Sequence, residues 1–186
     1  MHIQPQPARF HAETTIEGLR VVIPASRNWF IMLFLVAWLG GWTIGETNVA
    51  GQLLNPGDKT PSGFLLFWLA GWTLGGLFAV GTVLWQLAGR EILIANSLAL
   101  THRFEVFGVG VSRSYGASDI KHLRTTEYSP PPTMNQRAML PPFFGSGHGP
   151  IAFDYGARTI RIGSSLEEAE AKSLLNSLVA HLPRQL

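Results

Sequence analysis

Histidines, serines and acids are the residues with which this sequence could do chemistry, and their spacing matches none of the common reactions. A metal site needs ligands at a regular interval, and His122, His148 and His181 show neither i,i+4 pairing nor an H-x-x-x-H spacing. His102 lies on the apolar face of a predicted strand, where a hydrogen-bonded core histidine is the commoner role. The chain has no cysteine, which excludes disulfides and thiolate-bound metals.

Two glycine-rich stretches lack the residues that would complete a nucleotide site. Residues 145–149 lack the Lys-Ser/Thr of a phosphate loop, and residues 108–112 lack the third glycine and the following helix of a dinucleotide fingerprint. Serine, histidine and aspartate occur without an elbow motif that would expose a nucleophile. Glu167, Glu168 and Glu170 are explained by the start of a helix. We therefore predict no enzyme, no cofactor, and no catalytic or metal site.

The composition indicates a membrane protein instead. Charged residues make up 14% of the 186 positions, against about 25% in a typical soluble domain. The formal charge of +2 is too small to favour nucleic acid as a partner. No charge occurs from Asn28 to Gly45 or from Thr60 to Gly89. These runs predict two transmembrane helices, at 28–45 and 60–89. Buried helices of a soluble protein, or a signal peptide for the first run, are the alternatives.

The basic residues predict the orientation of these spans. Arg20 and Arg27 precede the first span, and two arginines follow the second soon after it ends. The connecting loop, 46–62, holds one lysine offset by two acids. The positive-inside rule then places both termini in the cytoplasm and this short loop outside. We expect the chain to reside in a bacterial inner membrane.

The two spans contain a near repeat, because residues 38–45 (Trp-Leu-Gly-Gly-Trp-Thr-Ile-Gly) match residues 68–75 (Trp-Leu-Ala-Gly-Trp-Thr-Leu-Gly). Each copy contains a GxxxG pattern, whose small residues share a helix face and let backbones approach closely. The predicted packing residues are Gly41, Gly45, Gly71, Gly75 and Ala79. The pattern leaves open whether they pack within one chain or between copies in a homo-oligomer. Neither predicted span has an ionisable interior residue, which disfavours a channel or transporter.

Residues 90–186 read as strands followed by one helix. Six strands are predicted, at 91–95, 98–106, 111–115, 119–127, 151–154 and 158–162. A helix follows at 166–182, with Ser165 as its cap, Glu168 completing a capping box, and Pro183 as its stop. This order predicts an antiparallel β-sandwich or barrel closed by a C-terminal α-helix.

This order resembles the small bacterial membrane proteins that carry a pleckstrin-homology-like (PH-like) domain. The resemblance extends over residues 28–182 and is carried by 89–94, Leu98–Phe104, Tyr115, Asp119-Ile120, Leu123-Arg124 and the helix 166–182. It implies seven strands, one more than the six predicted. The β-prone segment Thr14–Ile23 is therefore expected to supply an extra strand. The resulting division is an N-terminal cytoplasmic segment (1–27), a transmembrane hairpin (28–89) and a cytoplasmic PH-like domain (90–186).

Two sets of residues are candidates for binding. The proline-rich segment 129–150 is unusually long for a loop, and its apolar residues predict a surface for a partner or the membrane interface, unless they fold back over the sheet. The candidate partner-binding residues are Met134, Arg137, Met139, Leu140, Phe143 and Phe144. The candidate lipid-headgroup residues are Arg90, Arg103, Arg113, Lys121 and Arg124, unless these form an ordinary solvated surface.

These features predict a non-enzymatic, membrane-anchored platform for interaction or assembly. The expected partners are the lipid bilayer, another membrane or cytoplasmic protein, and a second copy of the chain. A module that senses anionic lipid is the alternative, although the first hairpin lacks the dense basic cluster of phosphoinositide-binding relatives. An enzyme with an unrecognised site is a remote third.

Overall fold

The computed structural model describes residues 9–54, 62–126 and 149–183. The chain forms two compact units, which are interleaved along the sequence. One unit is Arg27–Leu87, and the other combines Met1–Ser26 with Ala88–Leu186. The N-terminal segment is thus part of the β-rich unit, in keeping with the expectation that it supplies a strand.

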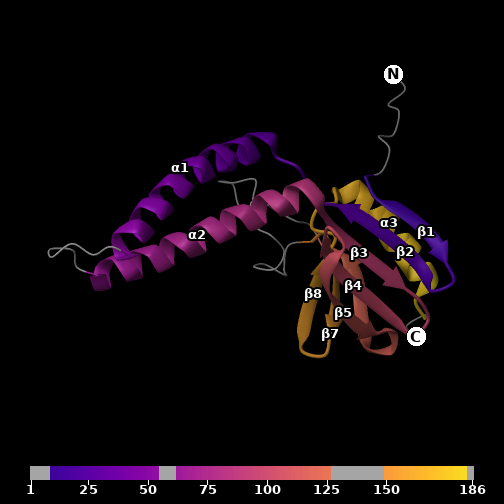
Figure 1. Cartoon of the computed structure of the whole chain (residues 1–186). Coiled ribbons are helices and arrows are strands. Elements are labelled where there is room, and N and C mark those ends of the chain that lie inside the picture. The colour runs from indigo at the N-terminus through magenta and orange to yellow at the C-terminus, as the bar shows by residue number, and fades with distance from the viewer. Residues whose placement is uncertain (1–8, 55–61, 127–148, 184–186) are drawn as a thin grey trace, which may run out of the picture. The chain divides into compact units, whose positions relative to one another are not determined.

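The first unit is a pair of apolar helices, α1 (Trp29–Leu54) and α2 (Ser62–Ala88), shown in Figure 1. At 1.5 Å per residue they measure about 39 and 40 Å, which exceeds the ~30 Å hydrocarbon core of a bilayer. Within their most apolar stretches, 6% of the residues of α1 and 11% of those of α2 are buried. Their apolar side chains therefore face outward, unlike those of a core helix in a soluble protein.

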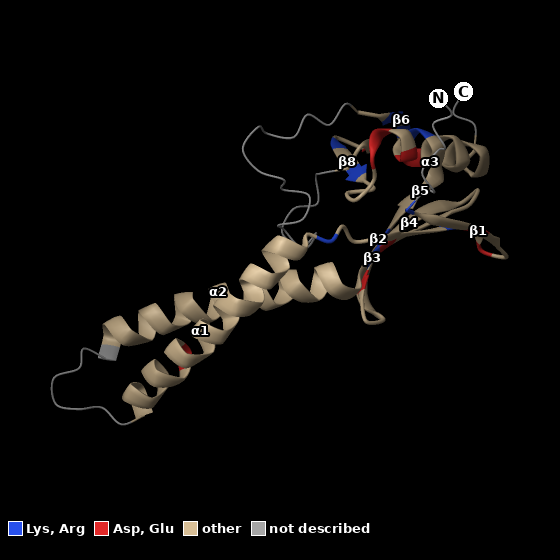
Figure 2. Cartoon of the chain, turned by 90° about the horizontal axis from the view of Figure 1, so that it is seen from above, with Lys and Arg blue, Asp and Glu red and all other residues tan. Residues whose placement is uncertain are grey.

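The first helix is longer than predicted. It runs beyond Gly45 to Leu54, so Glu46 lies inside the helix and not in the connecting loop. In Figure 2 this acid is the red position on an otherwise uncharged α1. The polar side chains after Gly45 are compatible with this helix because they donate hydrogen bonds to backbone carbonyls one turn earlier. The Thr47 hydroxyl donates to Thr43 O at 2.9 Å, and Asn48 Nδ2 donates to Ile44 O at 2.8 Å.

The second unit contains two antiparallel sheets and a C-terminal helix (Figure 1). The five-stranded sheet has the order β1 (His11–Thr15), β2 (Gly18–Pro24), β3 (Gly89–Ala95), β4 (Ala99–Val106) and β5 (Val109–Gly116). A short 3-10 turn, η1 (Ala117–Asp119), leads to the three-stranded sheet of β6 (Ile120–Thr125), β7 (Ile151–Tyr155) and β8 (Arg158–Ile162). Helix α3 spans Glu168–His181.

Two neighbouring strands of the five-stranded sheet, β2 and β3, are separated in sequence by both apolar helices. β2 pairs with β3 so that Pro24 lies opposite Arg90, and Ala25 N donates to Gly89 O at 2.9 Å. The segment Thr14–Ile23, expected to give one strand, instead covers the end of β1 and most of β2. An N-terminal hairpin thus joins a sheet whose other strands follow the second apolar helix.

The core of this unit lies between the sheets and α3. Alternate residues of β2, β3 and β4 are fully buried, including Val21, Leu93 and Leu100, and the inner face of α3 adds Leu174 and Leu178. Burying such apolar side chains is the main favourable term in folding.

The capping box of α3 was predicted two residues too early in the sequence. Glu167 is the N-cap, and it forms a capping box with Glu170. The Ser165 hydroxyl is instead used elsewhere, because it accepts a hydrogen bond from Ser26 N at 3.2 Å. The helix consequently begins two residues later than predicted.

Candidate functional site

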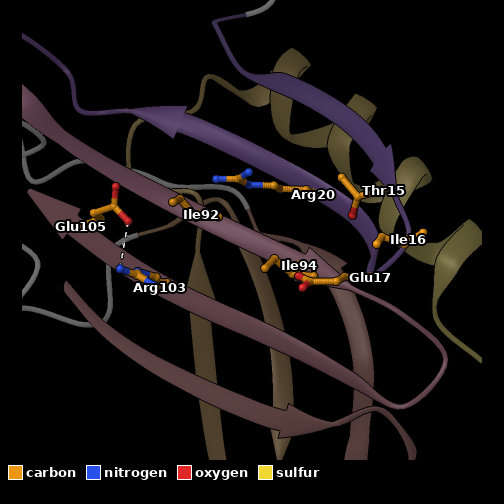
Figure 3. Close-up of a pocket in the computed structure, with 8 residues that line it drawn as sticks. All are labelled: Thr15, Ile16, Glu17, Arg20, Ile92, Ile94, Arg103 and Glu105. Carbon is orange, nitrogen blue, oxygen red and sulfur yellow. Dashed lines mark ion pairs between the residues drawn. The ribbon is translucent and has the colours of Figure 1, made fainter. Parts of the chain in front are cut away.

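A groove of about 400 Å³ lies on the face of the five-stranded sheet that points away from the core (Figure 3). It is lined by Thr15, Ile16, Glu17, Arg20, Ile92, Ile94, Arg103 and Glu105. Directly opposed residues in an antiparallel pair share a face. Arg20 opposes Ile94 and Arg103 opposes Ile92, so two isoleucines of β3 form a floor between two arginines.

The two arginines of the groove differ in their bonding. Arg103 Nη2 lies 3.1 Å from Glu105 Oε2 and donates to Gly108 O at 3.1 Å. Arg20 is exposed and has no hydrogen bond or ion pair with any described residue. It can therefore bind an external anion without losing a bond within the chain. Glu13 opposes Arg20 on β1 and Glu17 lines the same groove, so a ligand would have to place its acidic group on Arg20 between these carboxylates and its apolar group on the isoleucine floor.

The candidate headgroup residues do not form one patch. Arg90 shares the outer face with Arg103, since Arg90 opposes Glu105 in the β3–β4 pair. Arg113 points to the other side of the sheet, opposite His102, and Lys121 belongs to the second sheet. Arg20 also lies on the outer face, although it was not among the candidate headgroup residues. The alternation of apolar and polar residues in the β-prone segment could have identified it, because Arg20 falls between the buried Leu19 and Val21.

Arg124, the fifth candidate, is held in an ion pair within the second sheet. Its Nη1 and Nη2 contact the two oxygens of Asp154 at 3.0 and 3.2 Å. The Thr159 hydroxyl donates to the same carboxylate at 2.8 Å. The Arg124 guanidinium, together with this hydroxyl, lowers the pKa of Asp154 to about 2. Arg124 is therefore engaged with β7, and its contact with a headgroup stays a prediction.

A buried polar cluster joins the first sheet to the turn before α3. Glu91 of β3 is 2% exposed, and its carboxylate accepts hydrogen bonds from Gly163 N at 2.7 Å and Ser164 N at 3.1 Å. The Ser164 hydroxyl donates at 3.2 Å, and His102 Nε2 lies 2.8 Å from Glu91 Oε1. His102 is thus a buried core residue with a partner. Sequence reasoning missed Glu91 because its partners are distant in the chain.

The seam of the apolar hairpin is built by tryptophans packing on glycines. Trp42 Nε1 donates to Trp72 O at 3.0 Å, and a side chain at Gly76 would overlap the Trp42 ring. A Cβ at Gly45 would lie 3.7 Å from the Trp72 ring. These contacts place glycine opposite indole, and not glycine opposite glycine.

The predicted glycine stripe is therefore only partly in this seam. Gly45 faces α2 and Ala79 is 3% exposed. A Cβ at Gly41, Gly71 or Gly75 would meet no described atom within 4 Å. Of the two alternatives left open, packing within the chain therefore does not involve these three glycines, because the indole rings occupy the space between the backbones. Their packing between copies remains a prediction.

Glu46 introduces a polar contact into the same seam. Its Oε1 accepts a hydrogen bond from the Thr73 hydroxyl of α2. Glu46 Oε2 and Trp72 Nε1 are buried without a hydrogen-bond partner among the described residues. The predicted end of the first span at Gly45 had excluded this acid, so the expectation of a span without an ionisable residue does not hold for α1.

The base of the hairpin is fixed by polar residues next to the β unit in sequence. Asn28 caps α1, since its Oδ1 accepts from Ile31 N at 3.1 Å, while Asn28 N donates to Gln86 Oε1 at 2.9 Å. Arg27 Nη2 donates to Leu87 O at 3.3 Å. The ends of α1 and α2 are therefore tied together where the chain enters and leaves the sheet.

The candidate partner-binding residues Met134, Arg137, Met139, Leu140, Phe143 and Phe144 lie outside the described residues. No group of three or more histidines and acids that could hold a metal occurs in the described ranges. No protein-family model matches the chain, no curated protein matches it in sequence, and no solved structure matches it in fold.

Proposed function

We propose that this chain is a non-enzymatic platform for protein interaction or assembly, anchored in a bacterial inner membrane. In this proposal α1 and α2 cross the bilayer as a hairpin. The β-rich unit is a PH-like domain on the cytoplasmic side, where both termini lie. Two antiparallel sheets followed by a helix support this assignment of the domain, and the long, outward-facing apolar helices support the anchor.

The observation that carries the proposal is the insertion of the helices between paired strands. Residues 25–28 separate β2 from α1, and β3 begins directly after α2. A domain on a flexible linker would sample a large volume, whereas two such short tethers hold a binding surface beside the bilayer. That arrangement suits a fixed platform on which another protein assembles.

The groove supports a partner that presents an acidic side chain next to an apolar one. Arg20 is a cation without a partner among the described residues, and Ile92 and Ile94 form the floor. Charge complementarity of this kind fixes orientation and speeds association. The partner is therefore expected to be a membrane or cytoplasmic protein with an exposed acidic segment.

Affinity purification of the full-length chain from native membranes tests this function. The wild type is compared with Arg20→Glu and with Arg158→Glu, which reverses an exposed charge at the start of β8. We expect a protein that co-purifies with the wild type and with Arg158→Glu, and that falls at least tenfold with Arg20→Glu. Identical co-purifying proteins for all three chains, with equal thermal stability in detergent, would refute the groove as the binding surface.

Anionic-lipid sensing is a second candidate, because Arg90 and Arg103 share the outer face and Arg90 lies two residues after α2. The dispersal of the other three candidates favours it less than the platform. Hydrogen exchange of the chain in nanodiscs with and without anionic lipid tests it. Protection of β3 and β4 that depends on anionic lipid, and is lost in Arg90→Gln, would support lipid sensing.

A further inference from the structure

We propose that the β4–β5 turn inserts into the interfacial layer of the membrane that anchors the chain. The inserting tip consists of Phe107, Gly108, Val109 and Val111, and its ligand is the bilayer itself. The inference rests on the membrane-crossing part of the proposed function. It does not depend on the protein partner or on the groove.

Strand register places the tip near Gly89, the residue that follows α2 in the chain. β3 begins at Gly89, the residue after the last of α2, and Gly89 opposes Val106 in the β3–β4 pair. Opposed Cα atoms in an antiparallel pair are about 5 Å apart. One further residue adds 3.8 Å, so the Cα of Phe107 lies within about 9 Å of Gly89 for any tilt of the domain.

Exposed apolar side chains also occur at the two helix ends that adjoin the β-rich unit in sequence. Leu87, the next-to-last residue of α2, is 45% exposed, and Trp29 and Phe30 at the start of α1 are 61% and 81% exposed. Tryptophan is enriched at the membrane interface. The headgroup layer is about 5–8 Å thick on each side of the hydrocarbon core. The Cα of Phe107 lies within about 13 Å of Ala88, the last residue of α2. If α2 ends at the edge of the hydrocarbon core, the tip is within reach of that layer.

The turn carries a residue that its backbone does not favour. Phe107 and Gly108 are the two central residues of a tight hairpin and have φ of 50° and 85°, as in a type I′ turn. This turn favours Asn-Gly, and a bulky residue with positive φ is uncommon. Phe107 is also 70% exposed. A large ring held in strained backbone, without burial in the domain, indicates a use outside the domain.

The surroundings of the turn fit a lipid surface. Val109 and Val111 on the neighbouring edge strand are 80% and 58% exposed. The nearest acid is Glu105, which opposes Gly110 and is paired with Arg103 at 3.1 Å, and the sequence from Val106 to Ser118 adds no other. Arg103 braces the tip through its hydrogen bond to Gly108 O at 3.1 Å. Exposed apolar side chains together with a nearby cation are typical of interfacial membrane contacts.

Site-directed labelling of the full-length chain tests the proposal, because the chain has no cysteine of its own. Phe107→Cys and Ile16→Cys carry a fluorophore in nanodiscs that contain brominated lipid. Ile16 is the matched control, since it is 107% exposed in the turn between β1 and β2, at the opposite end of the sheet from Gly89. We expect lipid quenching at least threefold stronger at 107, and iodide quenching correspondingly weaker.

Two further variants make the result decisive. Leu74→Cys, near the middle of α2, reports whether the helices are in the bilayer. Phe107→Asn with a label at Val109→Cys should lower lipid quenching without loss of thermal stability, because asparagine suits this turn. Equal iodide quenching at 107 and 16, in samples where the label at 74 is shielded, overturns the proposal. Iodide access at 74 would remove the membrane anchor, and the proposal with it.

Discussion

At the residue scale, Glu91 shows how a buried charge is stabilised in the β-rich unit. Burial opposes ionisation of this carboxyl. The hydrogen bond and charge of His102, with the backbone donors Gly163 and Ser164, outweigh burial and hold the pKa of Glu91 below its usual value. The ionised carboxylate thereby ties β3 to the turn that precedes α3. The sequence could indicate His102 as a core residue, but not Glu91, because Gly163 is distant in the chain.

Replacing this carboxylate should destabilise the β-rich unit strongly. In Glu91→Leu the two backbone donors and His102 lose their buried acceptor, and we expect a loss of about 3–5 kcal/mol in unfolding free energy. Denaturant unfolding in detergent, followed by circular dichroism, measures it. Glu13→Leu, at an exposed position of β1, is the control and should change the value by less than about 0.5 kcal/mol. Equal effects of the two variants would contradict the role of Glu91.

The Asp154 ion pair predicts an acid limb of stability. Its pKa in the folded chain is about 2, below the ordinary value of 3.8. The folded state therefore favours the ionised form, so the contribution is complete well above pH 3.8 and is lost as the pH falls toward 2. Thermal midpoints of the wild type and Asp154→Asn should differ above pH 5 and converge between about pH 4 and pH 2. A pH-independent difference would contradict this assignment.

At the element scale, the apolar helices could be predicted from uncharged runs, but their contacts could not. The glycine pattern indicated close packing, whereas the indole rings of Trp42 and Trp72 fill the seam. The end of α1 was missed because Glu46 looked like a boundary, and its partner Thr73 lies on the other helix. Patterns along one helix do not say which side chains of a second helix will face them.

Adjacent glycines of α2 give a direct test of this seam. Gly76→Ala places a methyl group against the Trp42 ring, and we expect a loss of about 1–3 kcal/mol from overpacking. Gly75→Ala meets open space, and the higher helix propensity of alanine should leave stability equal or slightly raised. Thermal unfolding in detergent measures both. A similar loss in both variants would mean that the open glycines are packed, as they would be between copies of the chain.

At the scale of the whole molecule, the strand order after the second helix and the closing helix were predictable from alternation and amphipathic spacing. The position of the N-terminal hairpin in the sheet was harder to predict. Residues 14–23 were recognised as β-prone, but the pairing of β2 with β3 joins residues on either side of two apolar helices. Such pairing depends on which ends the intervening helices bring together, and local patterns do not encode that.

Removing the apolar hairpin should leave a soluble β-rich unit. Replacing residues 27–87 with Asn-Gly gives a four-residue loop between Ala25 and Gly89, whose backbones are already hydrogen-bonded. We expect a folded monomer without detergent, with dispersed amide resonances and a cooperative thermal transition. An insoluble or unfolded product would show that the hairpin is needed to complete this unit.

The separation of β2 from β3 also has a consequence for biogenesis, if the helices cross the bilayer as proposed. During synthesis, β1 and β2 leave the ribosome before either helix. The edge of β2 that pairs with β3 stays unpaired until both helices and β3, through Ala95, have been made. β3 reaches the same side of the membrane as β2 only if the intervening chain crosses the bilayer an even number of times. A nascent chain that crosses once cannot close its sheet, so folding of the domain acts as a checkpoint on correct topology.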